Sequence, residues 1–107
     1  MMKEKKHDII TLGRSCIDLY SQSIGSAFNE IKGFDAFVGG SPLNIAVACS
    51  RLGLKTSLLT AIGNDKVGEF IINFLKKENV DINSIPNKNG SRTSAAVLGI
   101  QPPDNFP

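Results

Sequence analysis

The stretch that most constrains the possible fold of this chain is residues 37–46, which read Phe-Val-Gly-Gly-Ser-Pro-Leu-Asn-Ile-Ala. A β-prone run stops at Gly39 and Gly40, which have no Cβ, so a ligand can lie against their backbone. Ser41 is a good N-cap residue, and Pro42 suits the first position of a helix. The free N–H groups of a helix start here would point toward the glycines and favour an anionic or hydroxyl-rich ligand. The stretch predicts a strand, a turn and a helix around a small-molecule pocket.

Asn44 lies near the end of the first turn of that predicted helix. Its amide offers both a donor and an acceptor at the same place, which suits contact with a ligand. Two plainer interpretations stay open. The glycine pair can form a simple turn, and an asparagine often bonds to nearby backbone instead of a ligand.

The flanking segments alternate between strand and helix patterns. Residues 8–13 form a short apolar run closed by a glycine, which is typical of a buried parallel strand with both faces covered. The helix that follows Ser41 should extend to Leu52, because Gly53 stands where a C′ glycine is expected. Small apolar residues around this helix favour close packing on a sheet. Residues 56–62 then predict the next strand.

A second helix should begin after Asn64 or Asp65, either of which can cap it. An apolar stripe at helical spacing predicts its core face, with no cofactor role. The stripe consists of Val67, Phe70, Ile71, Phe74 and Leu75. Asn79 can end the helix. A polar loop over residues 83–90 leads to a last strand over residues 93–100.

Residues 19–37 differ from the rest, because serine and glycine interrupt them and their aromatic residues are spread among polar neighbours. We expect two short strands there, with turns at 24–26 and 32–33, on a separate layer. Elsewhere the strand–helix alternation with short connections predicts a doubly wound α/β sheet. Such a domain needs more strands than this chain holds, and the chain stops directly after a strand-like run. We therefore expect an incomplete domain.

Composition narrows the function classes. The 107 residues allow one domain at most, and a net charge of +2 gives no reason to invoke nucleic acid. No apolar run approaches the roughly 20 residues of a membrane span, and the lysine-rich residues 1–6 precede no signal-peptide core. Cys16 and Cys49 are too few for a disulfide framework and are interpreted as small apolar groups. These features favour a cytoplasmic protein, and His7 is expected to face solvent.

Three spaced motifs resemble those of the PfkB/ribokinase-like sugar kinases. Residues 39–46, followed by Gly53 and Gly63, resemble the N-terminal signature of that family. Residues 63–68, Gly-Asn-Asp-x-x-Gly, look like the second glycine turn and helix start of the family. Residues 12–18 resemble the end of its first strand, where an aspartate binds sugar hydroxyls. Together the matches extend from residue 8 to residue 107.

The resemblance implies a ribokinase-like doubly wound sheet, of which this chain holds the N-terminal βαβ units. It also implies lid strands at about residues 19–38 and 92–100, so that residues 1–107 form the N-terminal part of a kinase domain. The implied reaction transfers the γ-phosphoryl group of ATP to a sugar hydroxyl with the help of Mg²⁺. Residues 13–18, 39–42 and 92–104 look most like the members that act on 5-dehydro-2-deoxygluconate in inositol catabolism.

The chain departs from the family in one respect. The family's catalytic aspartate lies in a Gly-Ala-Gly-Asp motif of the C-terminal half, which also forms the anion hole and the nucleotide site. That motif does not occur here. Phosphoryl transfer relies on positioning, charge neutralisation and a base, and this chain supplies only the first. We therefore expect no catalytic, ATP-binding or metal-binding residue in this chain, and no activity from it alone.

The resemblance also implies which residues bind the substrate, a sugar or sugar acid. Asp18 matches the hydroxyl-binding aspartate, although a cap of a turn or helix is the plainer interpretation. Arg14 and Arg92 are candidates for gripping a carboxylate or keto group, because a guanidinium offers a planar fork of donors; the alternative is two solvated surface arginines. The predicted substrate-binding residues are Asp18, Gly39, Gly40, Ser41, Asn44, Arg14 and Arg92.

Two other function classes remain. The chain could be a non-enzymatic fragment that associates through exposed lid or edge strands, since open strand edges invite pairing with another chain; a homodimer through the lid strands is the related case for the whole kinase. It could also be a dinucleotide-binding module, suggested only by residues 10–13. The Gly-x-Gly-x-x-Gly turn that such a module needs does not follow that strand.

Overall fold

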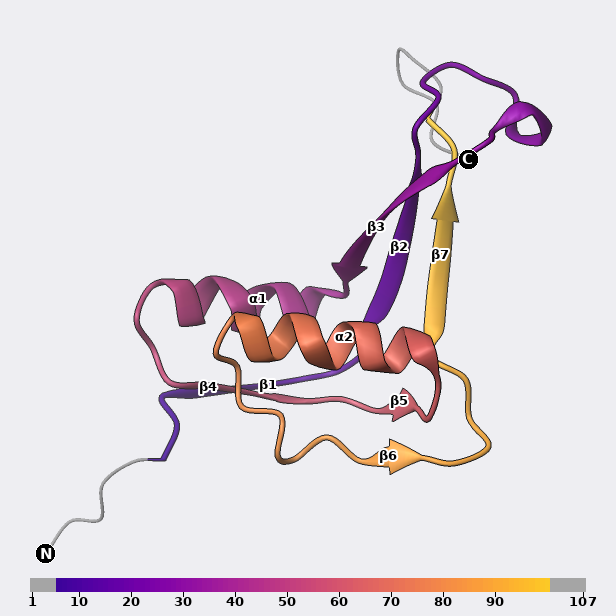
Figure 1. Cartoon of the computed structure of the whole chain (residues 1–107). Coiled ribbons are helices and arrows are strands. Elements are labelled where there is room, and N and C mark those ends of the chain that lie inside the picture. The colour runs from indigo at the N-terminus through magenta and orange to yellow at the C-terminus, as the bar shows by residue number, and fades with distance from the viewer. Residues whose placement is uncertain (1–5, 101–107) are drawn as a thin grey trace, which may run out of the picture.

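The fold consists of a parallel strand pair covered by helices, a second and shorter parallel pair, and a three-stranded sheet that extends away from them (Figure 1). The computed structural model describes residues 6–100, apart from the side chains of Asn87 and Lys88. In chain order the elements are β1 (Ile9–Leu12), β2 (Cys16–Ser21), η1 (Phe28–Glu30), β3 (Phe34–Gly39), α1 (Ser41–Arg51), β4 (Thr56–Leu59), β5 (Ile62–Gly63), α2 (Lys66–Lys77), β6 (Asn87–Lys88) and β7 (Ser94–Leu98).

The parallel pair of β1 and β4 confirms the predicted strand–helix–strand unit, with α1 as its crossover. Their register places Thr11 beside Leu58, and Leu58 is fully buried under the helices. α1 and α2 lie on the same side of this pair (Figure 1). The core between them consists of Leu43, Ala46, Val47, Leu58, Ile71, Leu75 and Val80.

The prediction that both faces of the first strand are covered is wrong for the described part of the chain. Ile10 is 60% exposed and Leu12 is 73% exposed, and their neighbour Leu59 on β4 is 39% exposed. Successive side chains of a strand point to opposite faces. Because α1 and α2 both cover the face that holds Leu58, the alternate side chains lie open on the other face.

α1 begins one residue earlier than its cap chemistry predicted. Gly40 is the N-cap, with a φ of 110° and no side-chain cap, and Ser41 is already helical, so the prediction of Ser41 as N-cap is wrong. The Gly40 carbonyl accepts the Asn44 N–H at 2.9 Å, which makes Gly40 the first residue of the hydrogen-bonded turn. Pro42 lies in the first turn as predicted, and Gly53, with a φ of 94°, follows the helix as predicted.

α2 follows its predicted signals closely. Of the two cap candidates, Asp65 is the N-cap, and its side chain accepts the Gly68 N–H at 2.7 Å. Ile71 is fully buried, whereas Phe70 is 41% exposed, so the assignment of Phe70 to the core is wrong. Asn79, with a φ of 59°, follows the helix in the left-handed conformation that ends it.

The second sheet has the strand order β3-β2-β7. β2 pairs antiparallel with β3 and parallel with β7. Two strands on a separate layer are confirmed, but β2 begins before residue 19 and β3 ends after residue 37, and the short η1 helix lies between them. The last strand of the alternation, β7, therefore joins β2 and not the β1–β4 pair.

His7 lies against the strand pair and not in solvent, contrary to the prediction. Its Nε2 is 2.6 Å from Oδ2 of Asp81, and its side chain is 15% exposed. Asp81 follows α2 and forms an isolated bridge with Ser57 on β4, which brings it beside the start of β1. Over residues 6–100, neither helix is long and apolar enough to cross a membrane.

Candidate functional site

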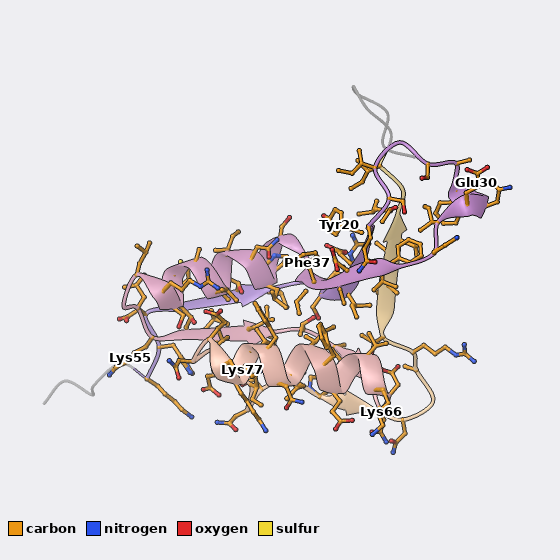
Figure 2. The ribbon with its side chains drawn as sticks, turned by 45° about the horizontal axis from the view of Figure 1, so that its top comes forward. Tyr20, Glu30, Phe37, Lys55, Lys66 and Lys77 are labelled. Atoms are coloured by element: carbon orange, nitrogen blue, oxygen red, sulfur yellow. The ribbon has the colours of Figure 1, made fainter. Side chains whose placement is uncertain are left out.

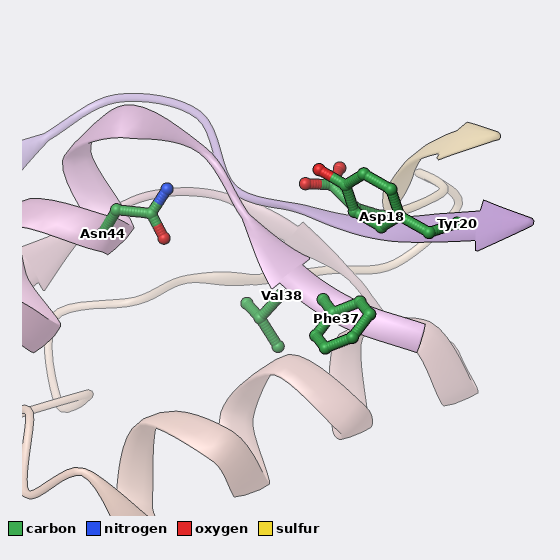
Figure 3. A pocket seen from close by; sticks show the side chains of 5 residues that line it. All are labelled: Asp18, Tyr20, Phe37, Val38 and Asn44. Carbon is green, nitrogen blue, oxygen red and sulfur yellow. The ribbon is translucent and has the colours of Figure 1, made fainter. Parts of the chain in front are cut away.

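A cavity of about 410 Å³ lies where β2 and β3 approach the start of α1 (Figure 3). Its lining combines polar and apolar side chains. The lining residues are Asp18, Tyr20, Phe37, Val38 and Asn44. Asp18 and Asn44 are two of the residues predicted to bind substrate, so the fold brings these two predicted residues to one cavity.

The strand register explains how these side chains meet. Asp18 and Tyr20 are two residues apart on β2 and therefore share a face of the sheet. Phe37 is the partner of Asp18 on β3. The rings of Tyr20 and Phe37 meet edge to face, with centroids 5.6 Å apart and an interplanar angle of 78°. Asn44 enters from the first turn of α1, only a few residues beyond the end of β3.

The carboxylate of Asp18 accepts one hydrogen bond and packs against a glycine. The thiol of Cys16 donates to its Oδ1 at 3.2 Å. Burial raises the pKa of that thiol, and the hydrogen bond to Asp18 adds to the effect, so Cys16 stays a neutral donor. On the other side, a Cβ at Gly39 would collide with the Asp18 carboxylate. Glycine at this position therefore makes room for the carboxylate.

Gly40 is needed for close packing of the turn. A Cβ there would collide with the carbonyl oxygen of Arg14, and its φ of 110° is one that other residues rarely adopt. Behind the turn, Thr11 on β1 donates to the Pro42 carbonyl at 2.8 Å. These contacts tie the glycine pair and the start of α1 to the end of β1.

The other predicted site residues lie outside the cavity lining. Ser41 is exposed at the first position of α1, Arg14 is exposed in the β1–β2 loop, and Arg92 is exposed just before β7. Tyr20, Phe37 and Val38 line the cavity although they were not predicted. The period-two spacing of Asp18 and Tyr20 is a signal that could have found one of them.

The Gly-Asn-Asp-x-x-Gly motif, residues 63–68, connects the start of α2 to the start of β7 through hydrogen bonds. Oδ1 of Asp65 accepts the N–H of Gly68 and the hydroxyl of Thr93, both at 2.7 Å, while Oδ2 accepts the Thr93 N–H at 2.8 Å. The Thr93 hydroxyl also accepts the Gly63 N–H at 3.0 Å. Hydrogen bonds from Thr93 and Gly68 hold the pKa of Asp65 below its usual value. The motif thus fixes the start of β7.

The side chains described in residues 6–100 include no group of three or more His, Cys, Asp or Glu that could hold a metal ion. Magnesium is bound mainly by oxygen ligands, of which carboxylates and phosphates are the usual ones. These side chains alone therefore provide no complete set of ligands for Mg²⁺.

Comparison with known proteins places this arrangement among known kinases. The model of the pfkB family carbohydrate kinases matches residues 6–105. The 5-dehydro-2-deoxygluconokinase of Geobacillus kaustophilus is 39% identical over 102 residues, which cover 94% of this chain and 30% of that protein. The chain thus spans under a third of the length of this curated relative.

Solved structures agree with that match. The fructokinase of Halothermothrix orenii is 30% identical with a TM-score of 0.79, covering 86% of this chain and 33% of that one. An uncharacterized sugar kinase of Pyrococcus horikoshii, crystallised with ATP, is 35% identical with a TM-score of 0.83; the match covers 92% of this chain and 32% of that one.

Proposed function

This chain belongs to the pfkB family of carbohydrate kinases, and we propose that it forms the sugar-binding part of an ATP-dependent kinase. The observation that carries the proposal is the meeting of Asp18 and Asn44 at one cavity beside the glycine turn. The carboxylate of Asp18, whose Oδ1 already accepts from the Cys16 thiol, would accept hydrogen bonds from sugar hydroxyls. The Asn44 amide adds one acceptor and two donors. A sugar offers a matching set of groups.

The proposed substrate is 5-dehydro-2-deoxygluconate, a sugar acid of inositol catabolism. The name of the Geobacillus kaustophilus relative supports this choice. Arg14 and Arg92 are the proposed partners of its carboxylate or keto group, because a guanidinium offers a planar fork of donors; both side chains are exposed and lie outside the cavity lining. Both would act on parts of the substrate that project beyond the cavity.

We propose that the three-stranded sheet of β2, β3 and β7 is the lid of this site. β2 and β3 supply four of the five lining residues of the cavity, so a movement of the sheet would open or cover a bound sugar. ATP, Mg²⁺ and the catalytic aspartate would be held by residues outside this chain, which alone would be inactive. Free thiols at Cys16 and Cys49 support a cytoplasmic location.

The test uses the protein in its full encoded length, with MgATP and an assay coupled to ADP release. Turnover of 5-dehydro-2-deoxygluconate is expected, and Asp18→Asn should lower kcat/KM by about 10- to 100-fold, because one charged hydrogen-bond partner is lost. Glu30→Gln is the matched control. Glu30 lies on η1, at the tip of the sheet away from the cavity (Figure 2). Failure to phosphorylate any sugar would contradict the proposal.

A second candidate is association through strand edges, without enzymatic activity. In the part of the chain that the structure describes, β3 and β7 are the two edges of the three-stranded sheet, and Val97 on β7 is 46% exposed. Unpaired edges can add strands from a second copy, which also allows a homodimer of the kinase through its lid. Light scattering across a concentration series separates these cases from a monomer.

A further inference from the structure

The side chains that line the cavity are of two chemical kinds. Asp18 and Asn44 offer hydrogen-bonding groups, whereas Phe37 and Val38 are hydrocarbon. Figure 3 shows Asp18 and Tyr20 together on β2, with Phe37 and Val38 on β3. Figure 2 places Tyr20 and Phe37 close to one another on the sheet. Because Phe37 is the cross-strand partner of Asp18, a ligand that reaches the Asp18 carboxylate also lies close to aromatic carbon.

Phe37 is 54% exposed although its ring is large and apolar. Its contact with the Tyr20 ring holds it in an edge-to-face geometry, so the ring is oriented before a ligand arrives. Val38 packs against the core that α1 and α2 share, which anchors this end of β3. The site therefore holds a fixed aromatic surface that a ligand can cover.

We propose that Phe37, oriented by Tyr20, selects a substrate carbon that carries no hydroxyl, so that the site prefers a deoxy sugar acid to its fully hydroxylated counterpart. This inference rests on the proposed function and deepens it. A phenyl ring offers no donor or acceptor, so a hydroxyl placed against it loses its hydrogen bonds to water without replacement. A methylene group in the same place has no hydrogen bonds to lose, and it buries apolar surface of the ring.

The test compares 5-dehydro-2-deoxygluconate with 5-dehydrogluconate, which carries a hydroxyl in place of one hydrogen at carbon 2. Both are assayed with the protein in its full encoded length and MgATP. The unmodified protein should prefer the deoxy compound by about 10- to 100-fold in kcat/KM, the range in which an apolar pocket rejects an added hydroxyl. A ratio near one would overturn the inference without needing any variant.

Variants test whether Phe37 is the residue that selects the deoxy compound. Phe37→Ser should reduce that preference about tenfold, mainly by improving the reaction of 5-dehydrogluconate, whereas Phe37→Leu should keep it. Phe34→Ser is the matched control. Phe34 lies on the same strand, but its ring contacts Phe28 with centroids 6.3 Å apart, and it does not line the cavity. An unchanged ratio in Phe37→Ser, or an equal loss in Phe34→Ser, would overturn the role of Phe37.

The same assays separate this inference from the proposed function. Turnover of both sugar acids at equal efficiency keeps the kinase and removes the deoxy preference. Absence of turnover with these compounds and with fructose and ribose removes the kinase function, and the inference with it. Preference for the deoxy compound that Phe37→Ser abolishes supports both.

Discussion

The thiol of Cys16 donates a hydrogen bond to Oδ1 of Asp18 across 3.2 Å, on the same face of β2. Cys16 itself is only 6% exposed. Its donor is thus turned toward the carboxylate that is proposed to hold sugar hydroxyls, and it fixes one oxygen while the other remains for the ligand. The prediction that Cys16 is a small buried apolar group is correct for its burial, but the thiol also acts as a hydrogen-bond donor.

Replacement of Cys16 should affect sugar binding through the orientation of Asp18. We expect Cys16→Ala to raise KM by about 2- to 10-fold with little change in kcat, because one modest hydrogen bond is lost. Cys16→Ser supplies a hydroxyl donor and should restore most of the affinity. Cys49→Ala on α1 serves as the control. A KM for Cys16→Ala equal to that of the unmodified protein would argue against this role.

Gly39→Ala should remove sugar binding, because the new methyl group would collide with the Asp18 carboxylate and displace it. Gly53→Ala is an informative comparison. Gly53 has open space around it, but its φ of 94° strains other residues, so this variant should lose about 1 kcal/mol of stability and keep its sugar affinity. Isothermal titration and thermal unfolding of both variants measure the two effects separately. Equal sugar affinity in the two variants would contradict the prediction.

Leu75→Ala should destabilise the fold by about 2–5 kcal/mol, the usual effect of removing a fully buried leucine side chain. Leu75 is 0% exposed in the core between the helices and β4, whereas Leu52 is 82% exposed at the end of α1. Leu52→Ala should therefore change stability by less than about 0.5 kcal/mol. Urea unfolding of the two variants provides the measurement, and similar midpoints would show that the core is assigned wrongly.

Acid should weaken the hydrogen bonds of Asp65 that connect α2 to the start of β7. The folded-state pKa of Asp65 is lowered by its hydrogen bonds from Thr93 and Gly68, so its contribution to stability is present above the ordinary carboxylate pKa. That contribution disappears as the pH falls below about 4. The unfolding midpoint of Asp65→Asn should accordingly depend less on pH between about 5 and 2 than that of the unmodified protein. Identical pH profiles would contradict this assignment.

The pKa of Asp81 is also lowered, mainly by the Asn83 N–H and then by His7, and Arg51 lowers the pKa of Glu78. Both carboxylates lose stabilising interactions in the same acidic range. Asp65→Asn should therefore remove only part of the pH dependence of stability. The part that remains comes from Asp81 and Glu78, and its subtraction gives the contribution of Asp65.

Local signals were sufficient where the structure depends on local chemistry. The cap at Asp65, the left-handed Asn79 and the glycine after α1 each act within a few residues of their own position. The same holds for the apolar spacing that buries Ile71. Such features were predicted correctly because the physical cause and its effect share one short segment.

Predictions failed where a distant segment decides. Ser41 carries good cap chemistry, yet Gly40 is the cap, and it lies against the carbonyl of Arg14 from the β1–β2 loop. His7 was expected in solvent, but its partner Asp81 is 74 positions away in the chain. Neither contact can be predicted from the residues next to it in the sequence.

The sequence by itself determined the strand–helix pattern, the glycine turn and membership of the kinase family, because periodicity, capping and spaced motifs are properties of adjacent residues. The tertiary structure alone decided which side chains share the cavity. Antiparallel pairing of β2 with β3 places Phe37 opposite Asp18, and the turn at Gly40 brings Asn44 to the same cavity. A shift of that register by one residue would turn Phe37 to the other face, so the aromatic wall depends on strand pairing and not on composition.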